Sequence, residues 1–354
     1  MEQDIRKKNT DLQSLLADCT LCPRNCHADR LAGQTGYCGQ TAQLKAARAA
    51  LHYWEEPCIS GSAGSGAVFF TGCTMRCVFC QNHEIAAGRA GKEISEERLA
   101  EIFLALQEKG ANNINLVTAT HFAPLLVPAL ERAKRGGLHI PVVYNTSSYE
   151  KVSTLRLLDG LVDIYLPDFK YVSKELAAWL SGAPDYFETA SAAVEEMLRQ
   201  VGEPLFEAPD GRRLNAEQMN DACMEDGGEA ADSVFLMKKG VIVRHLALPG
   251  QEEDSRRVLS YLLRTFGNRI YISLMNQYTP MPGFVRRLRE SGITAADGPG
   301  VREQTLLGLT ERLSDEAYER LIGFAINEGI ENGFIQDGET AQESFIPAFD
   351  GEGL

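Results

Sequence analysis

The sequence lacks any apolar run long enough to cross a membrane as a helix. Its first residues, MEQDIRKKNTDLQSLL, are charged and lack the apolar core of a secretory signal. Basic residues are also scarce, since 35 Lys and Arg stand against 49 Asp and Glu, a formal net charge of -14. We therefore expect a cytoplasmic protein with no membrane association. The acidic balance disfavours nucleic acid as a partner, because a nucleic-acid site needs a basic face.

The rest of the composition is that of a folded protein with a sizeable core, at 44% hydrophobic and 24% charged residues. We divide the chain into a Cys-rich N-terminal segment with a bridge (1–60), a central region (61–280) and a C-terminal helical extension (281–354). An acidic, Gly-rich stretch near 204–235 interrupts the central region. Polar stretches of this kind lie on the surface, so we predict an insertion there.

Six short apolar runs, each separated from the next by a helical pattern, fill the central region. They lie at residues 67–72, 113–119, 140–147, 162–170, 240–250 and 270–277. Such runs are typical of parallel strands buried on both faces. Repeated βα units form a full or partial barrel or an open doubly wound sheet. In either case ligands bind at the carboxyl ends of the strands.

Three of the nine cysteines, Cys73, Cys77 and Cys80, follow the first apolar run with the spacing Cys-x3-Cys-x2-Cys. Clustered thiols in a reducing compartment favour a metal site over disulfides. Structural zinc would need a fourth ligand, for which His83 is the nearest candidate. Alternatively, three thiolates hold a [4Fe–4S] cluster and leave one iron open. An open iron can bind a chelating molecule such as S-adenosylmethionine (SAM) through nitrogen and oxygen.

The stretch from Cys73 to Cys80, with Phe79 just before the third cysteine, resembles the signature of the radical SAM enzyme superfamily. The wider sequence resembles the pyruvate formate-lyase activating enzyme-like branch, which includes glycyl-radical-enzyme activases, and within it a subgroup with an N-terminal Cys-rich segment. The matching pieces are GSGAVFFTGCTMRCVFCQN, NNINLVTATHF, LPDFKY, VRHLALPG and ISLMNQYTP. The resemblance implies an α/β fold, a partial (β/α)6 barrel of TIM type built from parallel strands, with a cluster at its top.

The resemblance also implies an activity. Such an enzyme reductively cleaves SAM to a 5′-deoxyadenosyl radical for hydrogen abstraction. The resemblance to activases implies a glycine of a protein substrate as the site of abstraction. It implies a low-potential electron donor of the flavodoxin or ferredoxin kind. The alternative is a non-enzymatic Fe–S or zinc-binding sensor or interaction protein that kept the barrel. That alternative arises because VTATHF stands where activases carry Gly-Gly-Glu.

Several residues are implied as ligands by the same resemblance. Cys73, Cys77 and Cys80 match the cluster ligands, and Phe79 takes the place of an aromatic near the adenine. Asp168 and Lys170 resemble an Asp-Leu-Lys element that activases use around SAM. The remaining expected contacts to SAM are Thr118 and Thr120 in place of Gly-Gly-Glu, Asn145 and Ser147 for the ribose or carboxylate, and Arg244 for the carboxylate.

A second group of cysteines lies near the N-terminus, in the pattern Cys19-x2-Cys22-x3-Cys26-x11-Cys38. Closely spaced pairs of this kind favour one metal centre. Four thiolates would close a structural zinc site, and they would equally hold an auxiliary [4Fe–4S] cluster. We leave the choice between zinc and a second cluster open.

Overall fold

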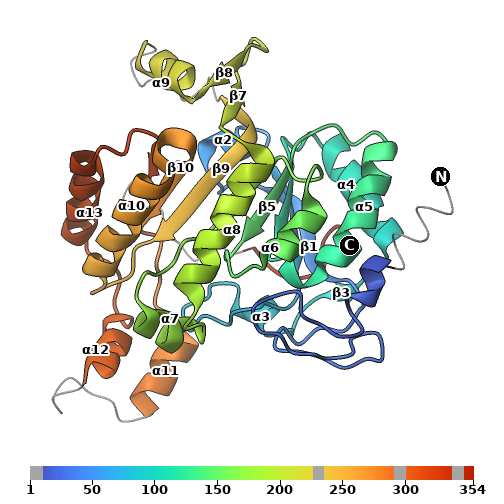
Figure 1. The fold of residues 1–354 in the computed structure, drawn as a ribbon, viewed down its shortest axis with the longest axis horizontal. Helices are drawn as coiled ribbons and strands as arrows, with labels where there is room; N and C mark the ends of the chain where they lie inside the picture. The colour runs from blue at the N-terminus through green and yellow to red at the C-terminus, as the bar shows by residue number, and fades with distance from the viewer. Residues whose placement is uncertain (1–10, 226–234, 291–299, 337–346) are drawn as a thin grey trace.

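The computed structural model describes residues 11–225, 235–290, 300–336 and 347–354. One mostly parallel sheet forms its centre, with the strand order β11-β10-β9-β6-β5-β4-β2-β1-β3 (Figure 1). The parallel strands are β2 (Ser65–Phe70), β4 (Ile114–Val117), β5 (Val142–Thr146), β6 (Ile164–Pro167), β9 (Leu236–Leu246), β10 (Tyr271–Met275) and β11 (Gly333–Ile335). The first six of these lie at the six apolar runs, so the predicted mostly parallel α/β fold is confirmed.

The edges of the sheet go beyond the prediction. β1 (Lys45–His52) pairs antiparallel with β2, and β3 (Lys92–Glu93) pairs antiparallel with β1. At the other edge, β11 pairs parallel with β10. The sheet therefore contains more strands than the six of the expected barrel.

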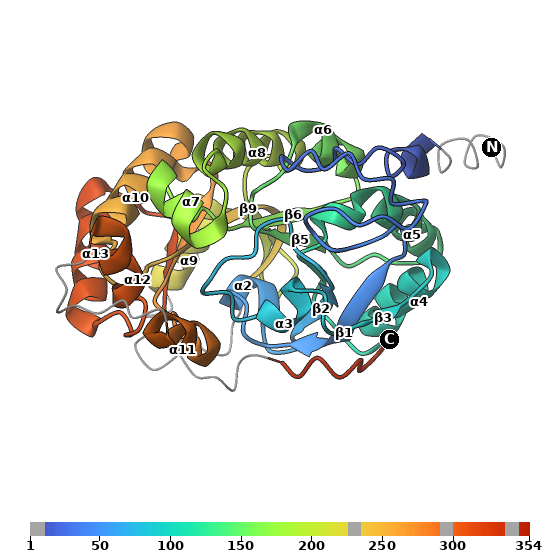
Figure 2. The same ribbon diagram turned by 90° about the horizontal axis from the view of Figure 1, so that it is seen from below.

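The central strands are buried along their whole length, which is why they read as continuous apolar runs. Every residue of β2, β4, β5, β6 and β10 is buried. The covering helices are α4 (Glu96–Glu108), α5 (Ala123–Arg135), α8 (Tyr186–Val201) and α10 (Glu252–Phe266) (Figure 2). α4 begins after Ser95, whose side chain accepts the Arg98 amide N–H at 3.1 Å and caps the helix.

One predicted helix is much shorter than its pattern. Between β5 and β6 the chain forms only α6 (Val152–Leu155) and a 3₁₀ turn (Arg156–Leu158). The preceding residues are held in a loop, because the buried Glu150 carboxylate accepts the Thr146 hydroxyl at 2.5 Å. Ser148 adopts the left-handed conformation at φ 62°, which also excludes helix.

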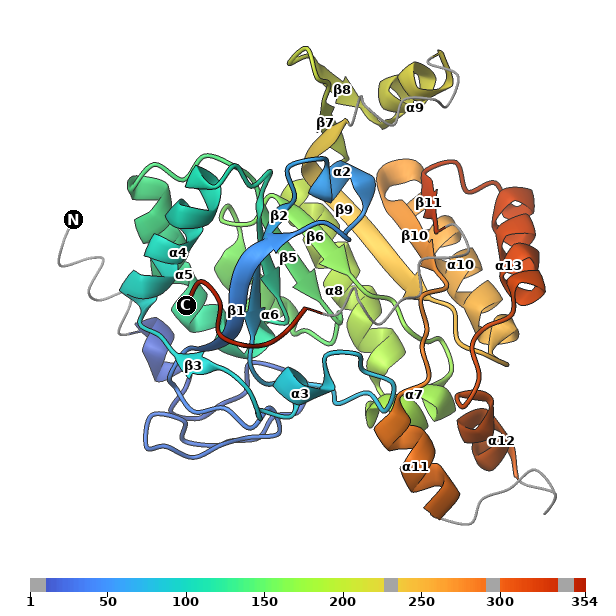
Figure 3. The same cartoon turned by 180° about the vertical axis from the view of Figure 1, so that it is seen from behind.

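The predicted insertion contains β7 (Leu205–Glu207), β8 (Arg213–Asn215) and α9 (Ala216–Glu225). It projects beyond the amino end of β9, on the side of the sheet opposite the carboxyl ends of the parallel strands (Figures 1 and 3). β7 pairs antiparallel with the start of β9 and so ties the projection to the sheet.

After residue 280 the chain forms α11 (Pro282–Glu290), α12 (Val301–Gly308), α13 (Asp315–Glu328) and then β11. The last described residues run along β1 (Figure 3). There the Ala49 amide donates to the Glu352 carbonyl at 2.8 Å, and the Gly351 amide donates to the Ala47 carbonyl at 3.0 Å. The last described residues thus cover the part of β1 that β3 leaves unpaired, which protects it from pairing with other chains.

The N-terminal Cys-rich segment lies at the edge where the parallel strands end, near the loop that carries α3 (His83–Ala86) (Figures 1 and 3). Its path between residues 19 and 43 contains no helix or strand. Arg24 anchors it to the loop after β2 by donating to the Thr74 carbonyl at 2.8 Å. Within the described part of the chain, no helix combines the length and apolar character that a membrane crossing requires.

Candidate functional site

A cavity of about 510 Å³ is lined by residues of the central strands and of the loops at their carboxyl ends. This volume is in the range of small-molecule sites. Most of the predicted site residues line it: Cys73, Cys77, Phe79, Cys80, Thr118, Asn145, Ser147, Asp168, Lys170 and Arg244. Residues that are up to 171 positions apart in the sequence, Cys73 and Arg244, therefore meet around one space, as parallel strand ends dictate.

The loop after β2 brings the three cysteines to this cavity. The Cys77 sulfur accepts the Ser181 hydroxyl at 2.9 Å, and the Cys73 sulfur accepts the Met75 amide N–H at 3.4 Å. Burial raises the pKa of Cys73 to about 11, and it also raises the pKa values of Cys77 and Cys80. These thiols are therefore protonated at neutral pH, and a metal must displace their protons to bind.

The donor set of this loop fits an iron–sulfur cluster better than a closed zinc site. His83, the candidate fourth ligand, is exposed and does not line the cavity. Among the described side chains, no group of three or more His, Cys, Asp or Glu residues is gathered as for a single ion. Three soft thiolates facing a ligand-sized cavity are the donors expected for a [4Fe–4S] cluster with one open iron.

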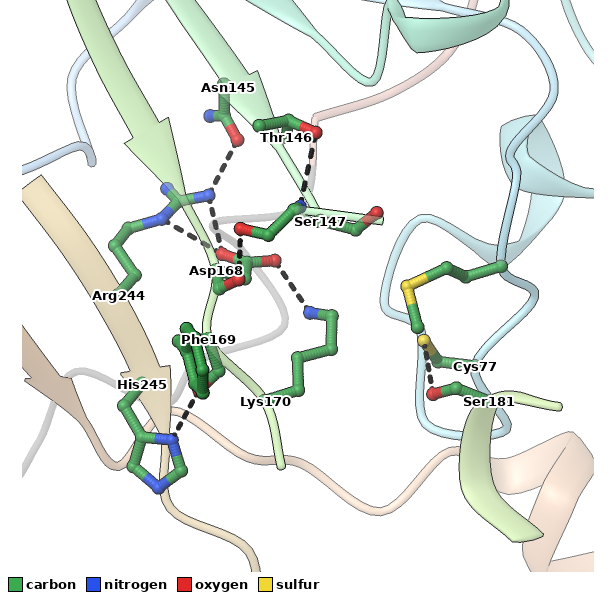
Figure 4. Close-up of polar contacts among 12 residues, drawn as sticks. Cys77, Asn145, Thr146, Ser147, Asp168, Phe169, Lys170, Ser181, Arg244 and His245 are labelled. Atoms are coloured by element: carbon green, nitrogen blue, oxygen red, sulfur yellow. Dashed lines mark hydrogen bonds and ion pairs between the residues drawn. The ribbon is translucent and has the colours of Figure 1, made fainter. Parts of the chain in front are cut away.

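Arg244, on β9, organises the polar wall of the cavity (Figure 4). Its guanidinium contacts the Glu55 carboxylate at 2.9 Å, the Asn145 side-chain oxygen at 2.6 Å and Asp168 at 3.0 Å. Burial raises the pKa of Asp168, but the Lys170 ammonium and the Arg244 guanidinium outweigh it and leave the pKa below its usual value. Asp168 is therefore ionised at neutral pH.

Lys170 connects this wall to the cysteines. Its ammonium contacts the Asp168 carboxylate at 2.6 Å (Figure 4). Burial opposes the Lys170 charge, but Asp168, followed by Cys77 and Cys80, raises its pKa above the usual value. The buried Tyr186 hydroxyl accepts the Lys170 amide N–H at 3.0 Å and fixes the turn after β6. A fixed cation thus faces the place where cysteine thiolates would gather.

The two threonines after β4 are separated by the backbone. Thr118 lines the cavity in the left-handed conformation, at φ 59°, which is rare for a β-branched residue and recurs at functional sites. Thr120 starts a 3₁₀ turn, is buried, and donates its hydroxyl to Glu150 at 2.5 Å. Thr120 does not line the cavity, and its expected contact with SAM stays a prediction that this position does not favour.

Sequence reasoning missed two carboxylates of the bridge between β1 and α2 (Pro57–Ser60). Glu55 and Glu56 both line the cavity. Glu56 is 8% exposed, one of its carboxylate oxygens has no hydrogen-bond partner in the described structure, and burial raises its pKa. The available signal was the stretch HYWEEP, in which two acids follow two aromatics directly after a strand.

The four N-terminal cysteines do not line this cavity. They form a separate group, although the segment touches the loop of the other three. A Cβ placed on Gly72, just before Cys73, would lie 2.7 Å from the Cys38 carbonyl oxygen. All eight cysteines with described side chains are free thiols.

Comparisons with known proteins match the region that carries the cavity. A family model for the radical SAM superfamily matches residues 67–203. An uncharacterized protein of Methanocaldococcus jannaschii is 30% identical over 276 residues, which cover 76% of this chain and 68% of that protein.

Two structures of Streptococcus suis SuiB, one bound to SAM and one to the precursor peptide SuiA, are also similar. Their TM-scores are 0.45 and 0.40, with 12% and 10% sequence identity. Each alignment covers 75% of this chain, which spans about half the length of SuiB, 48% and 47% in the two structures.

Proposed function

This chain belongs to the radical SAM superfamily, and on that premise we propose that it is an enzyme that cleaves SAM reductively. A [4Fe–4S] cluster would be held by Cys73, Cys77 and Cys80. When bound and reduced, that cluster supplies the electron for cleavage of SAM to methionine and a 5′-deoxyadenosyl radical. One observation carries the proposal: the three cysteines share a cavity of about 510 Å³ with the charged wall around Asp168.

The chain's own residues would orient SAM in this cavity. Lys170 presents a buried cation between Asp168 and the cysteines, which suits the SAM carboxylate. Asn145 and Ser147 line the wall near Asp168 and are proposed for the ribose. Phe79, which packs against Tyr278 at 6.5 Å between ring centroids, is proposed to contact the adenine.

Arg244 is proposed to act on SAM mainly through its neighbours. Its guanidinium already contacts Glu55, Asn145 and Asp168, so it fixes these side chains in place. The unpartnered oxygen of Glu56 supplies an acceptor for a cationic group inside the cavity. A carboxylate there would offset the absence of Gly-Gly-Glu after β4.

We further propose an activase-like reaction on a protein or peptide, with an electron donor of the flavodoxin or ferredoxin kind. The motifs shared with the activating-enzyme branch support this choice. The cavity lining supports it too, since it includes the large exposed hydrophobic residues Tyr53, Trp54 and Ile335, which are 50%, 58% and 51% exposed. Exposed apolar side chains beside a cavity are typical of a surface that receives a macromolecular partner.

The test is anaerobic reconstitution with iron and sulfide, followed by SAM and dithionite and an assay for 5′-deoxyadenosine. We expect product from the wild-type protein and only background from Cys77→Ala, because that variant removes a cluster ligand. Cys58→Ala is the matched control, since Cys58 is buried away from both cysteine groups. A wild-type protein that carries a cluster but releases no 5′-deoxyadenosine would contradict the proposal and favour a non-enzymatic sensor.

A further inference from the structure

Arg30 is a buried cation without a carboxylate partner. It is 1% exposed and is the largest by volume of the fully buried side chains among the described residues. Its guanidinium donates to the carbonyl oxygens of Gln40 at 3.1 Å, Thr41 at 2.7 Å and His121 at 2.6 Å. No ion pair joins it to an acidic side chain among the described residues. A buried charge is costly unless an opposite charge compensates it.

The nearby groups that can become negative are thiols. The Arg30 Nη1 atom lies 3.8 Å from the Cys19 sulfur, and Arg30 also acts electrostatically on Cys38. A neutral thiol does not compensate a guanidinium, but a thiolate does. Metal binding is the ordinary way to keep several neighbouring cysteines ionised at neutral pH.

The backbone around these cysteines already points amide groups at sulfur. The Tyr37 amide N–H donates to the Cys26 sulfur at 3.1 Å. The backbone N–H groups of Arg24 and Gln40 act in the same sense on Cys22 and Cys38, because each opposes the rise that burial causes in the pKa of its thiol. N–H groups aimed at sulfur stabilise thiolates and belong to the outer shell of metal centres.

The chain is also bent into uncommon conformations on either side of Cys26. Asn25 and His27 have φ values of 44° and 54°, in the left-handed region. The hydrogen bond from the His27 amide to the Cys19 carbonyl, at 3.0 Å, folds the segment back on itself. Such backbone costs free energy, and no helix or strand supports it here. Contacts of the Asn25 side chain with Lys151 and of His27 with Asp18 hold this bend around Cys26.

We infer that the four cysteines between residues 19 and 38 bind one metal centre as thiolates, and that Arg30 is the buried cation that offsets its negative charge. Zinc and a [4Fe–4S] cluster share this chemistry, since four thiolates bound to either give a net charge of about -2. The four described thiols are not gathered around one point as a single ion requires, so zinc would have to draw them together, whereas a cluster spans a wider group of sulfurs. The inference rests on the surroundings of Arg30, not on the proposed reaction at the cavity.

The position of this centre suggests what it does for the three-cysteine loop. Arg24 donates to the Thr74 carbonyl at 2.8 Å and to the Ser181 carbonyl at 3.2 Å. The Ser181 hydroxyl in turn donates to the Cys77 sulfur at 2.9 Å. A metal that orders residues 19–38 would therefore brace the loop that holds the other three cysteines.

Metal analysis can separate the two sites in the full-length chain. We expect Cys73→Ala/Cys77→Ala/Cys80→Ala, reconstituted anaerobically, to retain about one zinc or about four irons per chain. Zinc with no labile sulfide identifies the first kind of centre, and iron with equal sulfide identifies the second. Adding Cys22→Ala and Cys26→Ala should remove that metal. A folded triple variant that retains neither metal after reconstitution would overturn the inference.

A second comparison covers the possibility that the triple variant does not fold. In the chain with Cys73, Cys77 and Cys80 intact, Cys22→Ala/Cys26→Ala should contain about one zinc or about four irons less than wild type. Cys58→Ala should lose no metal, because that thiol belongs to neither group. Equal metal content in the wild type and Cys22→Ala/Cys26→Ala would refute the site.

Arg30 is tested as a positioning residue by metal retention against a chelator. We expect Arg30→Met to release the N-terminal metal about tenfold or more faster or at lower chelator concentration, as outer-shell substitutions do. Arg30→Lys keeps the charge and should restore most of the retention, which a purely structural role would not predict. SAM cleavage without metal at residues 19–38 would leave the proposed function intact and end this inference; metal there without SAM cleavage would do the reverse.

Discussion

Arg244 and Arg30 both lie largely out of solvent, each in a region that holds a group of cysteines, but they are neutralised differently. Arg244 contacts two carboxylates, those of Glu55 and Asp168. Arg30 contacts carbonyl oxygens, one thiol and the Phe122 ring, and no ion pair joins it to a carboxylate among the described residues. The cavity wall is thus charge-balanced by the chain itself, whereas the N-terminal segment needs an added anionic centre to reach the same balance.

This difference separates a site that is built in advance from one that is completed by its metal. The cavity lies on buried strands, whose ends fix the positions of Asp168, Lys170 and Arg244. The N-terminal segment has neither helix nor strand between residues 19 and 43, so its order depends on contacts to other elements and on its cysteines. We therefore expect substitutions to act differently in the two regions.

The largest expected effect is that of Arg244→Met. The substitution leaves the Glu55 carboxylate, 9% exposed, without its cation, while Asp168 keeps Lys170. We therefore expect a loss near the lower end of the about 3–5 kcal/mol of the free energy of unfolding that breaking a fully buried ion pair from one side costs. Urea unfolding of metal-free protein measures this loss. A loss below about 1 kcal/mol, the range of exposed ion pairs, would contradict the buried network.

Arg30→Met in the same metal-free protein is the matching half of this comparison. It leaves carbonyl oxygens without donors but no buried carboxylate, so we expect a smaller loss of about 1–3 kcal/mol. With metal bound, the same substitution should cost more than it does without metal. Equal losses in both states would show that Arg30 does not interact with a metal centre.

Sequence reasoning predicted the parts of the fold in which local pattern and burial agree. The six parallel strands were visible because each is apolar along its length, and the spacing of Cys73, Cys77 and Cys80 stands out in any context. The rule that ligands bind at strand carboxyl ends then placed Asn145 and Asp168 correctly beside the cavity. β11, with three residues, carries too little pattern to be recognised.

The structure departs from the sequence-based expectations where side chains depend on tertiary contacts. Thr120 follows a strand end, but the 3₁₀ turn directs its hydroxyl to Glu150, a residue expected to lie in a helix. Glu55 and Glu56 precede the first βα unit, so the strand-end rule could not find them. They reach the cavity because β1 pairs antiparallel with β2, so the bridge that follows β1 comes to lie along the cavity.

His245 is a third buried basic side chain, and it becomes a cation only at acidic pH. Burial lowers its pKa to about 4, despite a hydrogen bond to the Phe169 carbonyl; Lys170 lowers it further and Asp168 raises it. Between pH 6.5 and about 4 the unfolded chain binds a proton that the folded chain excludes. The free energy of unfolding should therefore fall by about 1.4 kcal/mol for each unit of decreasing pH.

His245→Gln isolates this contribution. We expect the wild-type protein to lose about 2 kcal/mol more than the variant between pH 6.5 and pH 5.0 in urea unfolding of metal-free protein. The buried Nε2 atom of His245 has no hydrogen-bond partner in the described structure, so nothing stabilises the added proton. Identical pH slopes for the two proteins would mean that His245 is protonated in the folded state.

The smallest expected effect belongs to Ser181, which joins the two regions. Its hydroxyl contacts the Cys77 sulfur and the buried Tyr171 hydroxyl, each at 2.9 Å, while its carbonyl accepts Arg24. Ser181→Ala removes only the hydroxyl and should cost about 1 kcal/mol of the free energy of unfolding, because one buried hydrogen bond is lost. Metal at the four N-terminal cysteines should be unchanged, since the carbonyl that holds Arg24 remains.

A double-mutant cycle with Tyr171→Phe measures whether that hydrogen bond carries the effect. If the two hydroxyls are partners, Ser181→Ala/Tyr171→Phe should cost less than the two single losses added together, because both single variants break the same bond. Additive losses would instead assign the effect to the Cys77 sulfur. The three-cysteine loop would then be held at two points, by Arg24 at the Thr74 carbonyl and by the Ser181 hydroxyl at the Cys77 sulfur.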